Sequence, residues 1–362
     1  MLRRRFEQVA VMLLSIIMLV TSTGIVSSLA SNVNESSAAP EISSTSTSAS
    51  TSTTVIEEGG SVTSSTVAQE GGAVIQTNTG DGTQENPYLI STLAEFLSIG
   101  NKVNNTASGN KYFTLANDID LSAVTEKDFL DNGGSLIGID KALSEKSENV
   151  FIVFDGNGYA LKGLNVTFEK STVASIFGWL NAKSVVKNVV IEEPVFRSTS
   201  DGMTAIAFVS AENNGTISGV KVTYPVLSAA VSQKTAFITA ENLGTVTDTY
   251  IRGTHTNLST STAENHTISA IGTVGAVAGI NHGAVSNVSA INIGMFIPET
   301  EASVVYGGIA GCNSGAVLNS VSTGNAKGGK STDSAGGIVG KAIAPAGAAV
   351  SYTHLTLPTS AL

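Results

Sequence analysis

The chain has 362 residues, and its 29 acidic residues exceed its 19 basic residues by ten. An acidic chain with scattered lysines lacks the clustered Lys and Arg that bind phosphates, which argues against nucleic-acid binding. Its single cysteine, Cys312, excludes an internal disulfide. The stability of the fold must therefore come from burial and backbone hydrogen bonds.

The first thirty residues have the pattern of a secretory signal. Three arginines at positions 3–5 form a basic start, residues 9–20 form an apolar run, and Ser28 and Ala30 supply the small residues before a cleavage site. The apolar run is shorter than the ~20 residues that a membrane-spanning helix needs. We expect cleavage after Ala30, no membrane span in the mature chain, and a place outside a bacterial cell or on its surface.

Residues 31–79 are dominated by Ser, Thr, Ala and Gly. Such a composition cannot bury enough apolar area to order the backbone, so we expect a disordered Ser/Thr-rich stalk. The alternative is a set of irregular Thr-rich strands. The branched residues Val55, Ile56, Val62 and Val67 are too sparse to alternate, which disfavours it.

The next segment carries clear signals for one helix and several strands. Thr92 and Glu95 form a capping box, which predicts a short amphipathic helix over residues 93–103. Apolar residues then alternate, or run between Gly and Asn turns, in residues 112–122 and 149–168. These two stretches are predicted to be strands.

An internal repeat is the strongest feature of the sequence. Each of four copies places a branched residue four positions before an asparagine, a small residue two before it, and a glycine two after it. Partial copies around Ile176 and Ile338 flank these four, and successive copies are 29 to 39 residues apart. The Asn and Gly pairs are Asn213 and Gly215, Asn242 and Gly244, Asn281 and Gly283, and Asn313 and Gly315.

A repeat of about thirty residues made of short alternating runs is typical of one turn of a β-solenoid. Even-spaced positions share a strand face, so the branched residue, the small residue and the asparagine should all point the same way. The asparagines could then hydrogen-bond as a ladder, and the glycines suit a corner with positive φ. A β-sandwich is the alternative, although it would not need a constant Asn-x-Gly register.

These segments resemble bacterial surface proteins with GLUG repeats. The likeness runs from Gly80 to about Ile343 and includes NPYLISTLAEF, KYFTLANDIDLS, FDGNGYALKGLNV and YGGIAGCNSGAV. The resemblance implies a right-handed parallel β-helix, capped by the short helix, in an adhesin-like extracellular chain, and it implies no catalytic residues. The chain departs from the family at residues 207–208 and 236–237, where Ala-Phe stands in place of paired glycines.

Three acidic residues are candidates for chemistry. Asp118, Asp120 and Asp155 could serve a polysaccharide lyase or hydrolase, or could supply oxygen ligands to calcium. The competing interpretation, which we favour, is that they bond to nearby backbone in turns and at strand edges. No cofactor other than calcium is indicated.

Exposed aromatic residues could stack on sugars. The candidates are Tyr88, Tyr112, Trp179 and Tyr224. Glycans and proteins of host or cell surfaces are therefore the expected partners. The first hypothesis is a non-enzymatic β-helix that acts as a spacer or adhesive part of a larger surface protein, and the alternative is a carbohydrate-active β-helix enzyme.

The final residues do not fit the repeat. Leu357, Pro358 and Thr359 begin a wall-sorting motif, but Ser360 stands where that motif needs glycine. In one reading frame this segment resembles a translated sequencing adapter, so we expect residues 349–362 to be an artefact. The expected organisation is a signal at 1–30, a linker at 31–79, a cap with the first turns at 80–168, and truncated repeats at 169–348.

Overall fold

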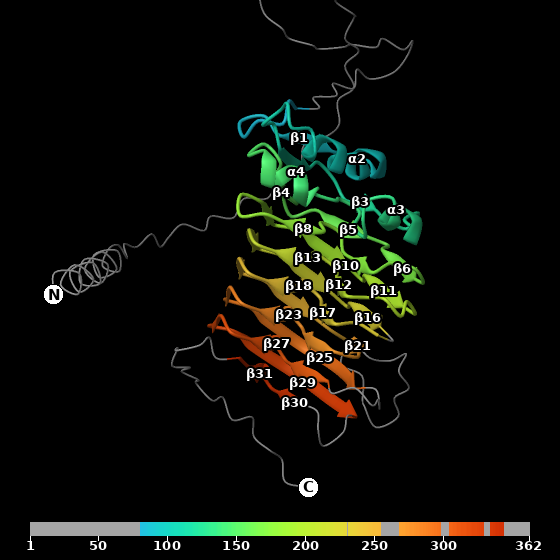
Figure 1. Ribbon diagram of the computed structural model, residues 1–362, viewed down its shortest axis with the longest axis vertical. Helices are drawn as coiled ribbons and strands as arrows, with labels where there is room; N and C mark the ends of the chain where they lie inside the picture. Colours follow the sequence, from blue (N-terminus) through green and yellow to red (C-terminus); the bar gives the residue numbers. More distant parts are fainter. Residues whose placement is uncertain (1–79, 230, 255–267, 298–303, 329–333, 344–362) are drawn as a thin grey trace, which may run out of the picture. The chain divides into compact units, whose positions relative to one another are not determined.

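The computed structural model describes residues 80–229, 231–254, 268–297, 304–328 and 334–343 (Figure 1). The predicted signal, stalk and terminal segment 349–362 lie outside these ranges. Within them, no helix is long and apolar enough to cross a bilayer. All the strand pairings described below are parallel, and the chain winds as a parallel β-solenoid, which confirms the predicted fold class.

A helical cap begins the described chain. Helix α2 (Leu93–Val103) has the predicted bounds, and its capping box is confirmed: Glu95 N donates to Thr92 Oγ1 at 3.2 Å and Thr92 N donates to Glu95 Oε2 at 3.0 Å. Two shorter helices follow. The elements of this region are β1 (Tyr88–Ile90), β2 (Tyr112–Leu115), β3 (Ile119–Asp120), α3 (Glu126–Leu130) and α4 (Lys141–Lys146).

Each of the first four complete coils contains five short strands. The first is β4 (Val153–Asp155), β5 (Ala160–Lys162), β6 (Asn165–Phe168), β7 (Val173–Ala174) and β8 (Trp179–Leu180). The second is β9 (Val185–Lys187), β10 (Val190–Glu192), β11 (Val195–Ser198), β12 (Ala205–Ala207) and β13 (Ser210–Asn213). The third is β14 (Thr216–Ser218), β15 (Lys221–Thr223), β16 (Val226–Ala229), β17 (Lys234–Ala236) and β18 (Thr239–Asn242).

Coils four to six complete the described solenoid. The fourth is β19 (Thr245–Thr247), β20 (Tyr250–Arg252), β21 (Ile268–Ala270), β22 (Thr273–Gly275) and β23 (Ala278–Asn281). In the next two coils one long strand replaces two short ones. They are β24 (Ala284–Ser286), β25 (Ser289–Ile297), β26 (Val305–Gly307) and β27 (Ala310–Asn313), then β28 (Ala316–Leu318), β29 (Val321–Gly328), β30 (Ser334–Gly336) and β31 (Val339–Ala342).

Equivalent strands of successive coils form four sheets. Sheet 1 has the order β1-β2-β4-β9-β14-β19-β24-β28, and sheet 2 joins two columns of strands because β25 pairs with both β20 and β21. Sheet 3 has the order β7-β12-β17-β22-β26-β30, and sheet 4 has the order β8-β13-β18-β23-β27-β31. Figure 1 shows the strands of sheet 4 stacked one above another along the solenoid.

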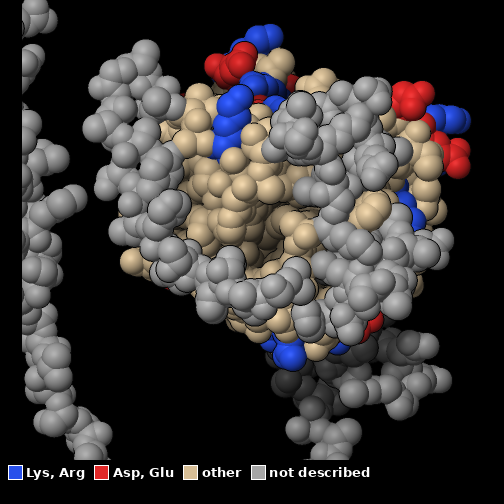
Figure 2. Space-filling view, turned by 90° about the horizontal axis from the view of Figure 1, so that it is seen from below, with Lys and Arg blue, Asp and Glu red and all other residues tan. Residues whose placement is uncertain are grey.

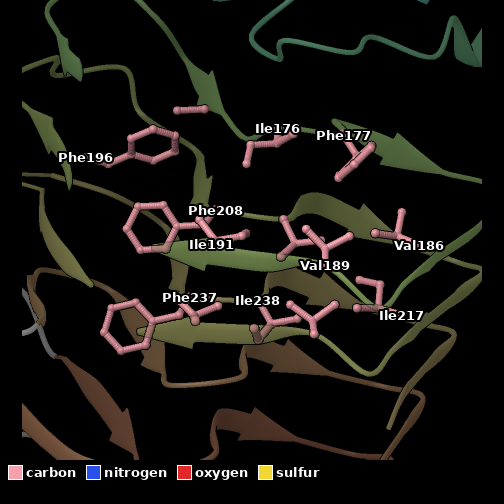
Figure 3. Close-up of a cluster of buried hydrophobic side chains, with 14 of the residues drawn as sticks. Ile176, Phe177, Val186, Val189, Ile191, Phe196, Phe208, Ile217, Phe237 and Ile238 are labelled. Carbon is pink, nitrogen blue, oxygen red and sulfur yellow. The ribbon is translucent and has the colours of Figure 1, made fainter. Parts of the chain in front are cut away.

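The interior is a continuous apolar core. Branched residues of sheet 1 form one buried column, and phenylalanines form another on the opposite side. Phe208 lies 4.8 Å from Phe196 and 5.9 Å from Phe237, measured between ring centroids, and Figure 3 shows the three rings one above another. Like residues stack on like residues because each coil repeats the alternation of the last one.

A buried ladder of asparagines runs along the inside of the corner between sheets 4 and 1. Asn213 Nδ2 donates to Asn242 Oδ1 at 2.8 Å, Asn242 Nδ2 donates to Asn281 Oδ1 at 2.7 Å, and Asn281 Nδ2 donates to Asn313 Oδ1 at 2.6 Å. Asn213, Asn242 and Asn281 are fully buried. Each buried amide is therefore satisfied by its neighbours in the coils above and below.

The glycines after these asparagines do not have the positive φ that we expected. Gly215, Gly244, Gly283 and Gly315 lie outside the left-handed region, and a Cβ atom on any of them would come within 2.2 Å of a backbone oxygen of the preceding coil. Glycine is needed here for close approach of two backbones. The left-handed corner lies instead just after sheet 1, at Asn188, Gly219, Asp248, Asn287 and Asn319.

The small residues of the repeat do not face the main core as we expected. Ala211 and Ala240 pack against Ala205 and Ala207 in a cluster separate from the main core. Ala205 and Ala211 line a concave corner between sheets 3 and 4, and Ala207 and Ala240 are buried behind them. The expectation that the small residue points the same way as the branched residue is therefore wrong, because the strand does not alternate regularly through this corner.

The carboxylate of Glu126 fastens α3 to the first complete coil. Its Oε1 accepts hydrogen bonds from the backbone N–H groups of Glu169, Lys170 and Ser171 at 2.8 to 2.9 Å, and from Ser171 Oγ at 2.9 Å. Burial opposes its ionisation, but these bonds outweigh burial and lower the pKa of Glu126 below its ordinary value of 4.5.

We expect Glu126→Gln to lower the free energy of unfolding at neutral pH by about 1 kcal/mol, because charge-assisted hydrogen bonds become neutral ones. A lowered folded-state pKa means that this stabilisation is present above the unfolded-state pKa and is lost as the pH falls through the folded-state pKa. Urea unfolding at several pH values measures it. A difference between variant and wild type that persists at acidic pH would contradict the assignment.

The C-terminal end of the described solenoid exposes apolar side chains. Leu318, Val321 and Ile343 are 58 %, 39 % and 41 % exposed. Figure 2 views the molecule from this end. Where described residues are visible, uncharged residues surround a hollow and charged residues lie at the rim.

Candidate functional site

A groove of about 580 Å³ occupies the concave corner between sheets 3 and 4, beside the cap. Sheet 3 contributes Ala205 and Lys234, and sheet 4 contributes Trp179, Glu212 and Glu241. Residues of the segment between α3 and α4, from Asp131 to Asp140, line one end together with Lys141, the first residue of α4. Its volume falls within the ~300–1,000 Å³ of small-molecule sites. We call this feature the Trp179 groove.

Residue size explains why the corner is open near the cap. Further along the solenoid the small position is glycine, and a Cβ on Gly279 would lie 2.9 Å from Thr235 N. A Cβ on Gly311 would lie 2.7 Å from Thr273 Cγ2. Sheets 3 and 4 therefore approach closely there, whereas Ala211 and Ala240 pack against the alanines of β12.

The pairing register of the strands in sheet 4 places three side chains of the groove in one row. Trp179, Glu212 and Glu241 are consecutive partners across β8, β13 and β18, so all three project from the outer face of sheet 4. Paired positions in neighbouring strands lie about 4.8 Å apart. The same row continues with Ile280 and Cys312 in the later coils.

Glu212 is held by three donors on one oxygen. Its Oε1 accepts from Trp179 Nε1 at 3.0 Å and from Asn214 Nδ2 at 2.8 Å, and Lys141 Nζ lies 3.5 Å away. Lys141 Nζ also lies 5.2 Å from the centroid of the Trp179 ring. Burial raises the pKa of Glu212, but these donors outweigh burial, so its pKa is lowered and the carboxylate is ionised at neutral pH.

An ion pair crosses the groove at the end away from the cap. Lys234 Nζ of sheet 3 donates to Glu241 Oε2 of sheet 4. Glu241 Oε1 lies 3.7 Å from His282 Nε2, and His282 Nδ1 lies 2.6 Å from Ser314 Oγ. Lys234 therefore neutralises Glu241 as Lys141 neutralises Glu212.

The other acidic residues of the groove are already engaged. Asp131 Oδ2 lies 2.5 Å from Lys127 Nζ, and Asp140 Oδ1 accepts from Leu143 N at 3.0 Å as the N-cap of α4. Of the four carboxylates that line the groove, Glu212 and Glu241 each lie beside a lysine of the groove, Asp131 pairs with Lys127, and Asp140 accepts a backbone hydrogen bond, so the lining keeps an excess of negative charge. This excess disfavours an anionic ligand, and the lysines beside Glu212 and Glu241 favour a polar ligand that donates hydrogen bonds to these two carboxylates without adding charge.

The three aspartates predicted from the sequence lie outside this groove, each bonded to nearby groups. Asp118 accepts from Ala160 N at 2.8 Å and pairs with Lys162 at 2.6 Å, and Lys162 holds the pKa of Asp118 below its ordinary value. Asp120 accepts from Ser122 N at 2.8 Å, which lowers its pKa.

Asp155 is bonded in the same way. It accepts from Asn157 N at 2.8 Å and Asn188 Nδ2 at 3.0 Å, and Lys187 Nζ lies 3.1 Å away. Burial raises the pKa of Asp155, but these groups outweigh burial and lower it. Within the described ranges, no group of three or more His, Cys, Asp or Glu residues could hold a metal ion.

The aromatic candidates are scattered over the surface. Tyr88 packs against Phe113 at 5.4 Å with Lys102 over its ring at 4.2 Å, and Tyr112 packs edge-on against Phe151 at 6.3 Å. Tyr224 is 39 % exposed and lies under Arg252 on the outer face of sheet 2. Of the four, Trp179 alone lines the Trp179 groove.

Glu212 and Glu241 were missed from the sequence, although a signal was present. Both stand one position before a ladder asparagine, in the two copies that carry Ala-Phe instead of paired glycines. A residue next to an inward-facing asparagine faces outward. The two repeat copies with Ala-Phe in place of paired glycines are therefore the copies that form the open corner and carry its two carboxylates.

Comparison with known proteins gives partial matches. No protein-family model matches the chain. Halomucin of Haloquadratum walsbyi is 30 % identical over 145 residues, which is 40 % of this chain and 2 % of halomucin. A candidate Gly-rich membrane protein of Evansella cellulosilytica is 29 % identical over 144 residues, which is 40 % of this chain and 15 % of that protein. The matched part is thus a small share of each relative.

Among solved structures, a candidate immunoglobulin A1 protease from Bacteroides ovatus is similar with a TM-score of 0.45 and 18 % identity. The match covers 73 % of this chain and 86 % of that structure.

Proposed function

We propose that this chain is a non-enzymatic β-solenoid module of an exported bacterial surface protein, and that it acts as a spacer or adhesive region. The observation that carries the proposal is the parallel stack of coils from β1 to β31, whose register shifts only within the β25 and β29 pair among the described pairings and which has a satisfied asparagine ladder inside. Such a stack forms a rigid rod that gains about 4.8 Å for each coil.

Three further observations support this role. The sequence begins with a secretory pattern and resembles GLUG-repeat surface proteins. Two relatives are named a halomucin and a membrane protein, and these names fit a place at the cell envelope. Asp118, Asp120 and Asp155 also serve local structure rather than an open catalytic site.

Protease shaving of intact cells tests the location. The full chain is expressed with its own first thirty residues in a bacterial host, and cells and medium are probed with an antibody to the solenoid. We expect the chain in the medium or accessible to protease on intact cells. Retention of the whole chain in the cytoplasm would overturn the proposal.

A carbohydrate-active enzyme is the second candidate, because the Trp179 groove holds two carboxylates in neighbouring strands. Glycoside hydrolysis needs one carboxyl group with a raised pKa to act as the acid. The pKa of Glu212 is lowered instead, and Lys234 pairs with Glu241. This geometry favours binding over cleavage.

A depolymerisation assay separates the two candidates. Purified full chain is incubated with neutral and acidic polysaccharides, and release of reducing ends is followed. We expect no release above background. Release that is abolished by Glu212→Gln or Glu241→Gln would establish the enzyme instead.

A further inference from the structure

We propose that the Trp179 groove binds a neutral saccharide through Glu212, Glu241 and the ring of Trp179. The inference rests on the proposed function, because it names a ligand class for the adhesive role. Three features of the groove lead to this class of ligand: its free acceptors, the pairing of its two glutamates with lysines, and its aromatic wall.

Each of the two carboxylates keeps one oxygen available. Glu212 accepts all its hydrogen bonds on Oε1, and Glu241 is bonded through Oε2. Among the described residues, no donor lies within hydrogen-bond distance of Glu212 Oε2, and His282 lies 3.7 Å from Glu241 Oε1. Two partly buried carboxylate oxygens in one groove favour a ligand that has several hydrogen-bond donors.

The pairing of the two glutamates with lysines indicates which charge a donor-rich ligand should carry. Lys141 and Lys234 already neutralise the two glutamates, so an ammonium ligand would have to displace a lysine. An anionic sugar would find no spare cation, because both lysines are paired. Hydroxyl groups donate hydrogen bonds without adding charge, which favours a neutral polyhydroxylated ligand.

The aromatic wall suits a sugar ring. Trp179 packs partly against the core, and Glu212 holds its Nε1, so the orientation of the indole is fixed. Lys141 lies over the ring, but its side chain is 55 % exposed, so its ammonium can leave the ring face and stay beside Glu212. The C–H face of a pyranose can then pack on the indole while its hydroxyl groups reach the glutamates.

The chain provides its own probe of this groove, because Trp179 is its single tryptophan. We expect emission from the full chain to change saturably when glucose, galactose, N-acetylglucosamine, cellobiose or lactose is added, for at least one of these sugars. Glucuronate and spermidine serve as charged comparators. Binding of a charged comparator alone, or of none of the five sugars, would overturn the inference.

Substitutions locate the binding. Glu212→Gln and Glu241→Gln keep side-chain shape but replace an ionised acceptor, and each should weaken affinity for the bound sugar about tenfold. Glu192→Gln, on the outer face of sheet 2, is the matched control and should leave affinity unchanged. Trp179→Phe, measured by calorimetry, should weaken binding while keeping a ring in the wall.

Equal affinity in the wild type and both glutamine variants would overturn the inference. The location test stays independent of this outcome. A chain that reaches the surface but binds no sugar refutes only the saccharide site, whereas a chain that binds sugar but stays in the cytoplasm refutes only the proposed surface role.

Discussion

Replacing Asn242 by alanine should lower the free energy of unfolding by about 2–4 kcal/mol. Asn242 stands in the middle of the ladder, where it accepts from Asn213 and donates to Asn281 at 2.7 to 2.8 Å, and it is fully buried. Its loss leaves the Asn281 amide oxygen without its donor and opens a cavity between two coils. Each unsatisfied buried group costs about 1–3 kcal/mol.

Urea unfolding followed by far-UV circular dichroism measures this effect. Asn165→Ala is the matched control, because Asn165 is exposed on β6 and accepts a hydrogen bond from Arg197 at 3.2 Å. The control should change stability by no more than about 0.5 kcal/mol. If Asn242→Ala changes it no more than the control, the ladder does not stabilise the solenoid.

Replacing Gly244 by alanine should cost about 3 kcal/mol or more. The new Cβ would lie 2.1 Å from the Gly215 oxygen and 2.7 Å from the Asn214 carbonyl carbon. Both atoms belong to the backbone of the neighbouring coil, so the coils must separate and weaken their hydrogen bonds. Inserting atoms into a packed interior typically costs about 1–3 kcal/mol, and a backbone clash lies at the upper end or beyond.

Gly158→Ala separates this clash from conformational strain. Gly158 has a φ of +79°, and a Cβ there would have no atom within 4 Å. The left-handed conformation alone costs about 1–2 kcal/mol for a residue with a Cβ. Equal losses in Gly244→Ala and Gly158→Ala, measured by the same unfolding experiment, would mean that close approach is not why Gly244 is glycine.

Local signals predicted local structure well. The Thr92 and Glu95 capping box identified α2 because its hydrogen bonds join residues three apart in the chain. The constant Asn-x-Gly register predicted stacked coils, and the asparagine hydrogen bonds follow from that stacking. Both inferences needed only the spacing of residues within one repeat.

Features that depend on contacts between coils were predicted less well. Gly244 looks like a turn glycine, and only the distance to Gly215 in the preceding coil reveals why a side chain is excluded. Ala211 was placed on the core side because regular alternation was assumed through a corner that breaks it. The merging of two strand columns at β25 likewise has no signal within a single repeat.

The candidate site was only partly accessible from the sequence. Trp179 was identified as a surface aromatic residue, but its position beside Glu212 and Glu241 depends on register across three coils. Asp118, Asp120 and Asp155 stood out because they are close in sequence to glycine and asparagine turns. The same turns supply the donors that occupy them.

The register of the coils underlies both the proposed module and its groove, and one engineered disulfide tests it. Cys312 is the single cysteine, and Ile280 is its partner on the neighbouring strand of sheet 4. Paired residues in adjacent strands lie about 4.8 Å apart, within the range of Cα separations that a disulfide spans. Leu318→Cys places a thiol on sheet 1 as the control.

The measurement is a count of free thiols in the unfolded full chain after mild oxidation, with size analysis to confirm a monomer. We predict no free thiol in Ile280→Cys and two in Leu318→Cys. Two free thiols in Ile280→Cys would contradict the in-register stacking of the coils.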